Sequence, residues 1–385
     1  MKRVFSAIVA ASGIALFAAD IAAAQSLGGF PIREPGAGVQ NGVKKDKKDK
    51  KGPMQIIVDA NGPGPYTSVA KAVKDVAEGG VVYVMHGVYN ESITLNKSVF
   101  IQGDRGPGSG VEINAPIGEP CLAFAPKEAT DHAVVANVTF AAKINSGANA
   151  CVDVQRGVFT LKESNVIGST SRPAVLVGGG TVTLKKNKIT GGSEGVYVEQ
   201  VHSLMNTAII DNKIVRNKIG IDISSGSRAD VVIAGNEIYN NLDSGVKSSG
   251  YGEAALIGNK IRNNKGIGVI LDKFSKLSLV RYNEIVQNSR DGIAIPYGVN
   301  GIIEDNEIVG NDRKAISLHK GGIEPIITNN KIVNNGDDGK KRRSSKRRRS
   351  KQERNDSDDR WRDINDDIGG RRDYDDFYDD RFDRN

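Results

Sequence analysis

The sequence predicts an all-β solenoid in which short parallel strands of successive coils stack on one another. Two observations carry this prediction: an Asn-centred tripeptide recurs at a constant spacing, and Val/Ile-rich segments of three to five residues lie between its copies. Such segments are too short for stable helices, and they alternate inward and outward with the period of two that strands have. The chain also holds 45 Gly and only 5% aromatic residues, which argues against an ordinary helical bundle.

The first residues have the three parts of a secretory signal. Two basic residues precede an apolar run from Val4 to Ala18, and Ala22-Ala23-Ala24 fits a small-residue cleavage site. We therefore expect residues 1–24 to be a signal peptide and the chain to be exported to the periplasm, the cell surface or the extracellular space. The run is too short to span a bilayer, and no later segment is a candidate span.

Charge concentrates in the two flanks of the chain. Residues 44–51 hold six Lys and two Asp, residues 340–351 carry nine cations, and an Asp/Arg-rich segment follows them. We expect residues 25–53 and 337–385 to be disordered. The basic run at 340–351 either contacts anionic envelope polymers or belongs to a tail that merely solvates the chain. The remaining body is nearly neutral, which argues against a nucleic-acid-binding surface on it.

A capping helix is predicted where the solenoid begins. Ser68 is a good N-cap, Gly79-Gly80 ends the segment, and four apolar residues recur at helical spacing between them: Val69, Ala72, Val73 and Val76. We expect a helix from Ser68 to Glu78 that covers the apolar end of the coil stack, as repeat folds require. Strand and turn segments are expected at 81–84 and 87–91.

The repeat itself has a period of 23 to 25 residues. The tripeptide Asn-(Lys/Glu)-Ile begins at Asn187, Asn212, Asn236, Asn259, Asn283, Asn306 and Asn330, and a second Asn follows five positions later at Asn217, Asn241, Asn264, Asn288, Asn311 and Asn335. A unit of about 24 residues makes one coil of three strands and three corners, with coils about 4.8 Å apart. Asn tolerates left-handed backbone angles and hydrogen-bonds neighbouring corners, so both rows are predicted to form ladders.

These units resemble the right-handed parallel β-helix repeats of pectin lyase-like proteins. The resemblance covers roughly residues 56–336 and is weaker before Gly180, where Asn137-Val138-Thr139-Phe140 and Asn165-Val166-Ile167 look like earlier copies. It implies a single right-handed parallel β-helix domain at 54–336 and an association with carbohydrate.

The opening of the domain also resembles the start of pectin methylesterases, in which a helix is followed by Gly-x-Tyr-x-Glu, here Gly87 to Glu91. The Gln-Asp-Thr-Leu and Asp-Phe-Ile-Phe-Gly stretches that hold the catalytic carboxylates of that family are missing. The Asp-Pro-His-Asp motif of β-helix alginate epimerases is missing too. The chain is therefore not expected to be a pectin methylesterase, and the fold alone does not assign an activity.

A candidate site emerges when one small-residue position of each coil is aligned: Cys121, Cys151, Ala174, Gly195, Gly220, Gly245, Gly268, Gly292 and Ala315. Side chains two and four positions later should face solvent on one sheet. Glu199 and Asp222 are then predicted to lie within about 5 to 8 Å of each other, with Lys247 on the next coil. These three are candidate catalytic residues that abstract a proton α to a uronate carboxyl, with charge balanced by Lys247 or Arg290.

Other interpretations of the same face remain open. Its oxygens are alternatively candidates for a divalent cation such as calcium, or the face is simply a solvated polar surface. Tyr197 is a candidate for stacking on a sugar ring. The further candidate substrate-binding residues are Asp153, Asp272, Arg290 and His319.

The two cysteines, Cys121 and Cys151, occupy equivalent positions one coil apart. Strands that are hydrogen-bonded neighbours bring such Cα atoms to about 4.8 Å, which a disulfide accepts, and an exported protein meets an oxidising compartment. A structural disulfide or a buried thiol pair is expected. The four His are scattered without ligand spacing, so no metal site is predicted from them.

The leading functional hypothesis is an exported β-helix protein that binds an acidic polysaccharide or cell-envelope polymer and modifies it by lyase or epimerase chemistry. The alternative is a noncatalytic envelope scaffold, adhesin or surface-interaction solenoid. We expect a monomer that binds no nucleic acid. A reacting centre needs a compact base, acid and charge-neutralising cation, whereas a scaffold needs only a patterned surface.

Overall fold

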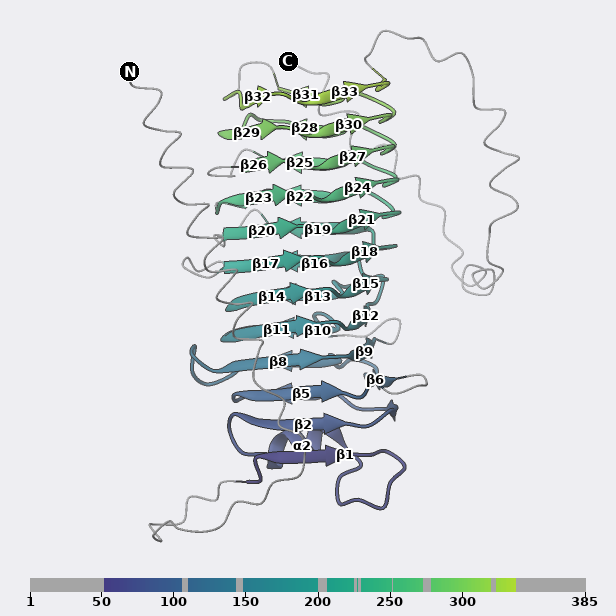
Figure 1. The fold of residues 1–385 in the computed structure, drawn as a ribbon, viewed down its shortest axis with the longest axis vertical. Coiled ribbons are helices and arrows are strands. Elements are labelled where there is room, and N and C mark those ends of the chain that lie inside the picture. Colours follow the sequence, from purple (N-terminus) through teal and green to yellow (C-terminus); the bar gives the residue numbers. More distant parts are fainter. Residues whose placement is uncertain are drawn as a thin grey trace, which may run out of the picture. The chain divides into compact units, whose positions relative to one another are not determined.

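The computed structural model describes residues 52–105, 110–142, 148–199, 206–224, 227, 230–250, 252–272, 278–319 and 323–336. The predicted signal peptide at 1–24, the linker up to Lys51 and the tail at 337–385 lie outside the described residues. The described part is a parallel β-helix with almost no helix, which confirms the predicted fold class (Figure 1).

Each coil from β2 to β31 contributes one strand to each of three parallel sheets, which we call the first, second and third sheet in chain order, while β1 lies before these coils and β32 and β33 after them. The first sheet contains β1 (Gln55–Val58), β2 (Gly80–Val84), β5 (Val99–Gly103), β8 (His132–Ala136), β11 (Val158–Lys162), β14 (Thr181–Lys185), β17 (Asn206–Ile210), β20 (Asp230–Ala234), β23 (Ala254–Ile257), β26 (Ser278–Arg281), β29 (Gly301–Glu304) and β32 (Ile326–Thr328). The second contains β3 (Gly87–Tyr89), β6 (Val111–Asn114), β9 (Val138–Ala141), β12 (Asn165–Ile167), β15 (Lys188–Thr190), β18 (Lys213–Val215), β21 (Glu237–Tyr239), β24 (Lys260–Arg262), β27 (Glu284–Val286), β30 (Glu307–Val309) and β33 (Lys331–Val333). The third contains β4 (Ile93–Leu95), β7 (Leu122–Phe124), β10 (Val152–Val154), β13 (Val175–Val177), β16 (Glu194–Val198), β19 (Ile219–Ile223), β22 (Val246–Ser248), β25 (Val269–Leu271), β28 (Ile293–Ile295) and β31 (Ile316–Leu318).

Inward side chains repeat from coil to coil and form the core. On the second sheet the Ile of each tripeptide pairs in register with the next, through Ile189, Ile214, Ile238, Ile261, Ile285 and Ile308. All six are fully buried. A constant residue at a constant period therefore builds a continuous apolar ladder, which explains why the period is readable in the sequence.

The small residue before each third-sheet strand is required by a tight corner. A Cβ added at Gly220 would lie 2.4 Å from the carbonyl oxygen of Gly245 and 2.6 Å from a methyl carbon of Ile238. Gly245 and Gly268 are equally crowded by the coil that follows each of them. The small residues aligned in the sequence thus occupy equivalent positions in successive coils.

The first Asn row forms a buried ladder, as predicted. Each Asn donates its backbone N–H and its side-chain amide to the Oδ1 of the Asn one coil further on. The amide also donates back to a first-sheet carbonyl of the preceding coil, as from Asn236 to Ile209 at 2.7 Å. Because these groups are buried, the ladder supplies hydrogen bonds that corner backbone would otherwise lack.

The second row, from Asn217 to Asn335, forms a ladder of the same design. The left-handed backbone conformation predicted for the Asn, however, occurs at the residue before it. Left-handed angles occur at the residue before each ladder Asn, for example Arg216 (φ 58) and Asn240 (φ 54), and not at the Asn itself. The ladder Asn is selected for its side-chain hydrogen bonds, while the corner turns one residue earlier.

The early copies of the repeat are displaced by one residue. Asn165 pairs in register with Lys188, so the position equivalent to Asn187 is Ser164. Ser164 continues the ladder, since its N–H donates to Asn187 Oδ1 at 3.0 Å and its hydroxyl accepts from Val138 N at 3.2 Å. The Asn165 side chain is exposed. In these copies the Asn is not the ladder residue, because Ser164 makes the ladder hydrogen bonds in its place.

Helix α2 (Val69–Asp75) covers the first coils, as expected from its apolar stripe. It is shorter than predicted, because Val76 adopts extended angles (φ −63, ψ 145) and ends it at Asp75. Lys97 Nζ then caps the free carbonyl of Lys74 at 3.1 Å. Figure 1 shows α2 beside β1 at the purple end of the stack.

The Gly-x-Tyr-x-Glu segment has a structural role at this end of the solenoid. Glu91 accepts hydrogen bonds from the Ser68 hydroxyl at 2.6 Å and from Val69 N at 2.7 Å, so its carboxylate holds the start of α2. The Tyr89 hydroxyl donates to Met85 O at 2.9 Å. The segment therefore docks the cap onto the coils.

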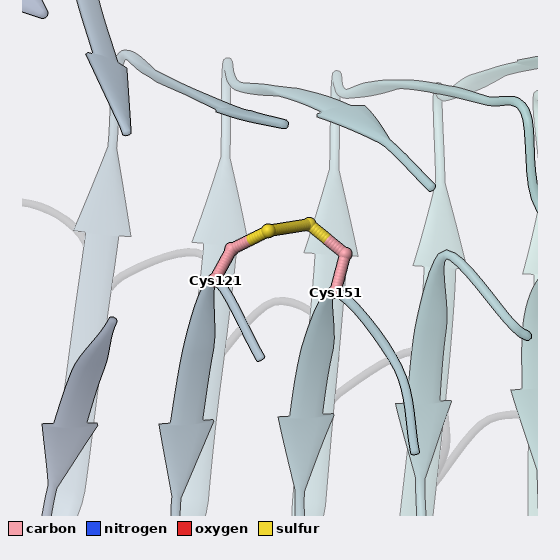
Figure 2. Close-up of a disulfide and its surroundings, with 2 residues drawn as sticks. All are labelled: Cys121 and Cys151. Carbon is pink, nitrogen blue, oxygen red and sulfur yellow. A yellow bond between two sulfur atoms is a disulfide. The ribbon is translucent and has the colours of Figure 1, made fainter. Parts of the chain in front are cut away.

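A disulfide joins Cys121 to Cys151, as the sequence predicted. The two residues open neighbouring third-sheet strands, β7 and β10, and their Cα atoms are 4.8 Å apart (Figure 2). Both are buried. The bond links coils that precede the Asn ladders, where fewer side-chain hydrogen bonds tie one coil to the next.

The last described coil is open at its far end. Its inward residues Leu318, Ile327 and Ile332 are 37%, 36% and 43% exposed, whereas their register partners one coil earlier are buried. No described residue covers them as α2 covers the first coils. Within the described ranges, no helix is long and apolar enough to cross a membrane.

Candidate functional site

The outer face of the third sheet carries the residues predicted to form the site. Register pairs them coil by coil in one row: Ala123, Asp153, Leu176, Tyr197, Asp222, Lys247, Ile270, Ala294 and Ser317. Tyr197, Asp222 and Lys247 are therefore consecutive. The strand spacing places neighbouring members about 4.8 Å apart at their Cα atoms.

Asp222 is the centre of this row and its most buried ionisable group. Its side chain is only 10% exposed, and its Oδ2 lies 3.4 Å from Lys247 Nζ. Its Oδ1 is buried and has no hydrogen-bond partner among the described residues. A buried carboxylate oxygen without a partner is costly, so it marks a place where a ligand's donor would be stabilising.

Burial raises the pKa of Asp222 above its ordinary value, because desolvation disfavours the charged form. Lys247 opposes this shift, while the negative charges of Glu194 and Asp243 add to it. A carboxyl poised in this way exchanges protons closer to neutral pH than an exposed Asp does, which suits acid–base chemistry.

Tyr197 flanks Asp222 on the preceding coil and is half-buried. Burial raises the pKa of its hydroxyl, a hydrogen bond with Ser224 lowers it, and the charges of Glu199 and Asp222 raise it. The hydroxyl therefore stays protonated and available as a donor at neutral pH. Its ring adds apolar surface to an otherwise polar face.

Glu199 lies two residues beyond Tyr197, just past the end of β16, and its side chain is exposed. Its charge acts on Tyr197, and the carboxylates that raise the pKa of Asp222 are Glu194 and Asp243. Sequence reasoning missed those two, because each precedes the aligned small residue and lies outside the predicted outward rows. Their effect on the pKa of Asp222 becomes visible only in the three-dimensional structure.

The other candidate residues are spread along the same side of the solenoid. Asp153, two coils before Tyr197, is buried, hydrogen-bonds the Gln155 side chain, and has its pKa raised by burial. Asp272 lies one coil beyond Lys247, with its Oδ2 3.5 Å from Ser249 Oγ. Both therefore belong to the face but not to the central trio.

Arg290 and His319 lie further along. Arg290 sits in the corner before β28, where its N–H donates to Gly266 O at 3.1 Å. His319 is exposed after β31, with its ring 6.4 Å from that of Tyr297. Asp153 and His319 are separated by seven coil steps, or about 34 Å at the strand spacing. The structure brings together only Tyr197, Asp222 and Lys247.

A divalent cation does not fit the described side chains on their own. Among them, no group of three or more His, Cys, Asp or Glu residues is close enough to hold a metal ion. The Lys247 ammonium also lies beside the one Asp222 oxygen that has a partner. Calcium at this face stays a prediction that needs further oxygen ligands from a substrate.

Comparison with known proteins identifies the repeat. Residues 194–347 match the family model described as "Right handed beta helix region". No curated protein sequence matches the chain.

Three solved structures are similar in fold. The A-module of the mannuronan C-5 epimerase AlgE6 from Azotobacter vinelandii shares 16% identity, with 69% of this chain and 92% of that chain covered and a TM-score of 0.39. The Dettilon tailspike protein (gp208) shares 14% identity over 73% of this chain and 62% of that chain, with a TM-score of 0.50. The Streptococcus pneumoniae surface protein and adhesin PfbA shares 11% identity over 69% and 92%, with a TM-score of 0.34. Of the three, the tailspike protein has a TM-score of 0.50, and at 14% identity that likeness extends to the fold alone.

Proposed function

We propose that this right-handed parallel β-helix protein is exported, binds an acidic polysaccharide, and acts on it at the row formed by Tyr197, Asp222 and Lys247. The observation that carries the proposal is the Asp222 carboxylate, which is nine-tenths buried, faces Lys247 through one oxygen and leaves the other without a partner. The proposed chemistry is abstraction of the proton α to a uronate carboxyl.

Asp222 is the base in this scheme. Its carboxylate takes the proton from the sugar carbon that bears the carboxyl group, and the electron pair of the broken C–H bond is delocalised into that carboxyl. In a lyase the bond from the next carbon to the glycosidic oxygen then breaks, the leaving oxygen takes a proton from water, and a double bond remains in the sugar. In an epimerase a proton returns to the opposite face of the same carbon.

Tyr197 and Lys247 support this step from the two neighbouring coils. The Lys247 side chain is 35% exposed, so its ammonium reaches both Asp222 and a ligand carboxylate and balances the developing charge. Tyr197 contacts the sugar ring and offers a protonated hydroxyl. Glu199 lies at the exposed edge, where it orients the Tyr197 side of the ligand through its charge.

The remaining candidates extend the contact to a polymer. Asp153 lies on the side of β10, while Asp272, Arg290 and His319 lie toward β31, so a chain bound along the coils meets them in turn. In this proposal they bind sugar units on either side of the reacting one. Their separation suits an extended ligand rather than a single sugar.

The test is turnover of a panel of uronate polymers by the mature protein, with unsaturated products followed by ultraviolet absorbance and epimers by proton NMR. Asp222→Asn removes the base with little change in volume, so it should abolish turnover and leave polymer binding largely intact. Asp312→Asn, an exposed change of the same type on another corner, should leave both unchanged. Parallel assays with added calcium and with EDTA test the cation.

Loss of turnover in both variants, or in neither, contradicts the role of Asp222. If the wild type turns over no uronate polymer and Asp222→Asn alters neither affinity nor stability, the noncatalytic scaffold or adhesin takes the place of the enzyme.

A further inference from the structure

Five lysines that are scattered over the sequence gather along one corner of the solenoid. They are Lys162 and Lys185 at the ends of β11 and β14, Lys186 in the corner, and Lys188 and Lys213 at the starts of β15 and β18. Lys162 pairs in register with Lys185, and Lys188 with Lys213. We call this set the lysine ridge. It lies where the first sheet turns into the second, on an edge different from the Asp222 face.

The lysine ridge is a concentration of uncompensated charge. All five side chains are exposed or half-buried, and none forms an ion pair with a carboxylate of the described residues. Of the acids in the same corners, Glu163 pairs with Arg105. The nearby carboxylates are Asp211 in the corner and Glu237, which lies opposite Lys213 in register and is 3.9 Å from Arg262.

The fold does not require this arrangement. Further along the second sheet, cations have acidic partners: Lys331 Nζ lies 2.7 Å from Glu307, and Arg262 lies 3.9 Å from Glu237. Like charges directly opposite each other on neighbouring strands are destabilising. The two lysine pairs of the ridge therefore carry a local cost in stability, and a bound polyanion removes that cost.

We infer that the lysine ridge is a binding site for a carboxylated polysaccharide lying along the solenoid axis. Ammonium groups repeat there at the coil spacing, about 4.8 Å, and so offer a line of charge to an extended polyanion. The outward residues beside them include three threonines, Thr160, Thr183 and Thr190, whose hydroxyls match those of sugars. The site lacks the interleaved aromatic residues on which nucleic-acid bases stack.

This inference deepens the proposed function, because it rests on an acidic polysaccharide being the ligand, and it assigns the polymer a second point of contact. The surroundings of Asp222 include Glu194 and Asp243, whose charges repel a polyanion. The lysine ridge adds attraction to that of Lys247 and Arg290 on the Asp222 face. Polymer capture and chemistry are thus assigned to different edges of the coil.

The test compares two full-length variants with the same change in net charge. The ridge variant carries Lys162→Gln, Lys185→Gln, Lys186→Gln, Lys188→Gln and Lys213→Gln; the control carries Lys71→Gln, Lys127→Gln, Lys260→Gln, Lys265→Gln and Lys314→Gln, all at exposed positions. Gln is compatible with the left-handed backbone of Lys186 (φ 56), since Gln287 adopts the same conformation (φ 55). Binding of fluorescein-labelled polygalacturonate is measured by anisotropy from about 50 to about 300 mM NaCl.

The ridge variant should bind about tenfold or more weakly at low salt and show a flatter salt dependence, because fewer counterions are released on binding. The control should lose no more than about threefold through the general change in charge. The ridge variant should also melt at or above the wild-type temperature, since like-charge pairs are removed. Equal losses in both variants, or an unchanged salt slope in the ridge variant, overturn the site.

Two further arms separate this inference from the proposed chemistry and from other ligands. Asp222→Asn should keep wild-type binding, and the ridge variant should keep any turnover of a short oligouronate, so each can fail without the other. A single-stranded oligonucleotide of equal charge that binds as tightly through the same lysines would overturn the assignment to a polysaccharide. Neutral dextran should not bind.

Discussion

The side-chain oxygen of Asn236 accepts hydrogen bonds from both the backbone N–H and the side-chain amide of Asn212, over 2.8 and 3.0 Å. The same pair of contacts repeats along two buried ladders, so the coils from β18 to β33 are tied to one another at two corners. Each contact satisfies donors that water does not reach.

Asn236→Ala should therefore destabilise the protein by about 2 to 4 kcal/mol, since it leaves two donors of Asn212 without partners and removes a hydrogen bond to the carbonyl of Ile209. Urea unfolding followed by circular dichroism measures the change. The matched control is Asn165→Ala, an exposed Asn one register position away, which should change stability by no more than about 0.5 kcal/mol. Similar losses in the two variants would argue against the ladder.

The capping helix gives a second stability prediction. Val73 is 2% exposed on the buried face of α2, whereas Lys74 is exposed on the other side. Val73→Asp should cost several kcal/mol because it buries an unpaired charge, and Lys74→Asp about 1 kcal/mol or less, mostly through the helix dipole. Thermal melts of both variants decide this, and equal shifts would refute the assigned face.

The disulfide should stabilise the N-terminal coils. Closing a loop of 30 residues between Cys121 and Cys151 is worth roughly 3 kcal/mol through the unfolded chain. The double variant Cys121→Ser/Cys151→Ser should lose about that much in urea unfolding. Dithiothreitol should destabilise the wild type but not the variant, and an effect of reductant on the variant would rule the disulfide out as its cause.

The raised pKa of Asp222 predicts how stability depends on pH. The folded state binds this proton more tightly than the unfolded state does, so stability is greatest below the ordinary Asp pKa of about 3.9 and falls as pH rises through the folded pKa. Asp222→Asn should remove this contribution. Between about pH 4 and 7 the variant should therefore gain stability relative to the wild type, as measured by urea midpoints. A difference that is constant over this range would show that Asp222 titrates normally.

Much of the fold could be predicted because each coil repeats the same physical problem. The buried Ile ladder and the crowded corner at Gly220 recur in every unit, so the period, the register and the outward row were readable from residue types. The exact partners were less readable: α2 ends at Asp75 because Val76 turns extended, and Ser164 replaces an Asn in the ladder. Ser164 keeps the ladder hydrogen bond, but it interrupts the row of Asn residues by which the repeat is recognised.

The candidate site was only partly readable. The register of Tyr197, Asp222 and Lys247 follows from the small-residue alignment, and the disulfide from the equivalent positions of its cysteines. Glu194 and Asp243 could not be found in this way, because both lie before the aligned small residue and not two or four positions after it. Their influence on Asp222 depends on where β16 begins and on how the chain bends before β22.

The sequence by itself determined the solenoid, because units of about 24 residues with short β-branched segments bury their apolar side chains by stacking as coils. Only the tertiary structure decided which charges meet. Lys162 and Lys185 are 23 residues apart in the chain and become register neighbours, and Asp222 loses its water while retaining one unpartnered oxygen. The net charge of the chain predicts neither effect, since electrostatic energy depends on distance and burial in three dimensions.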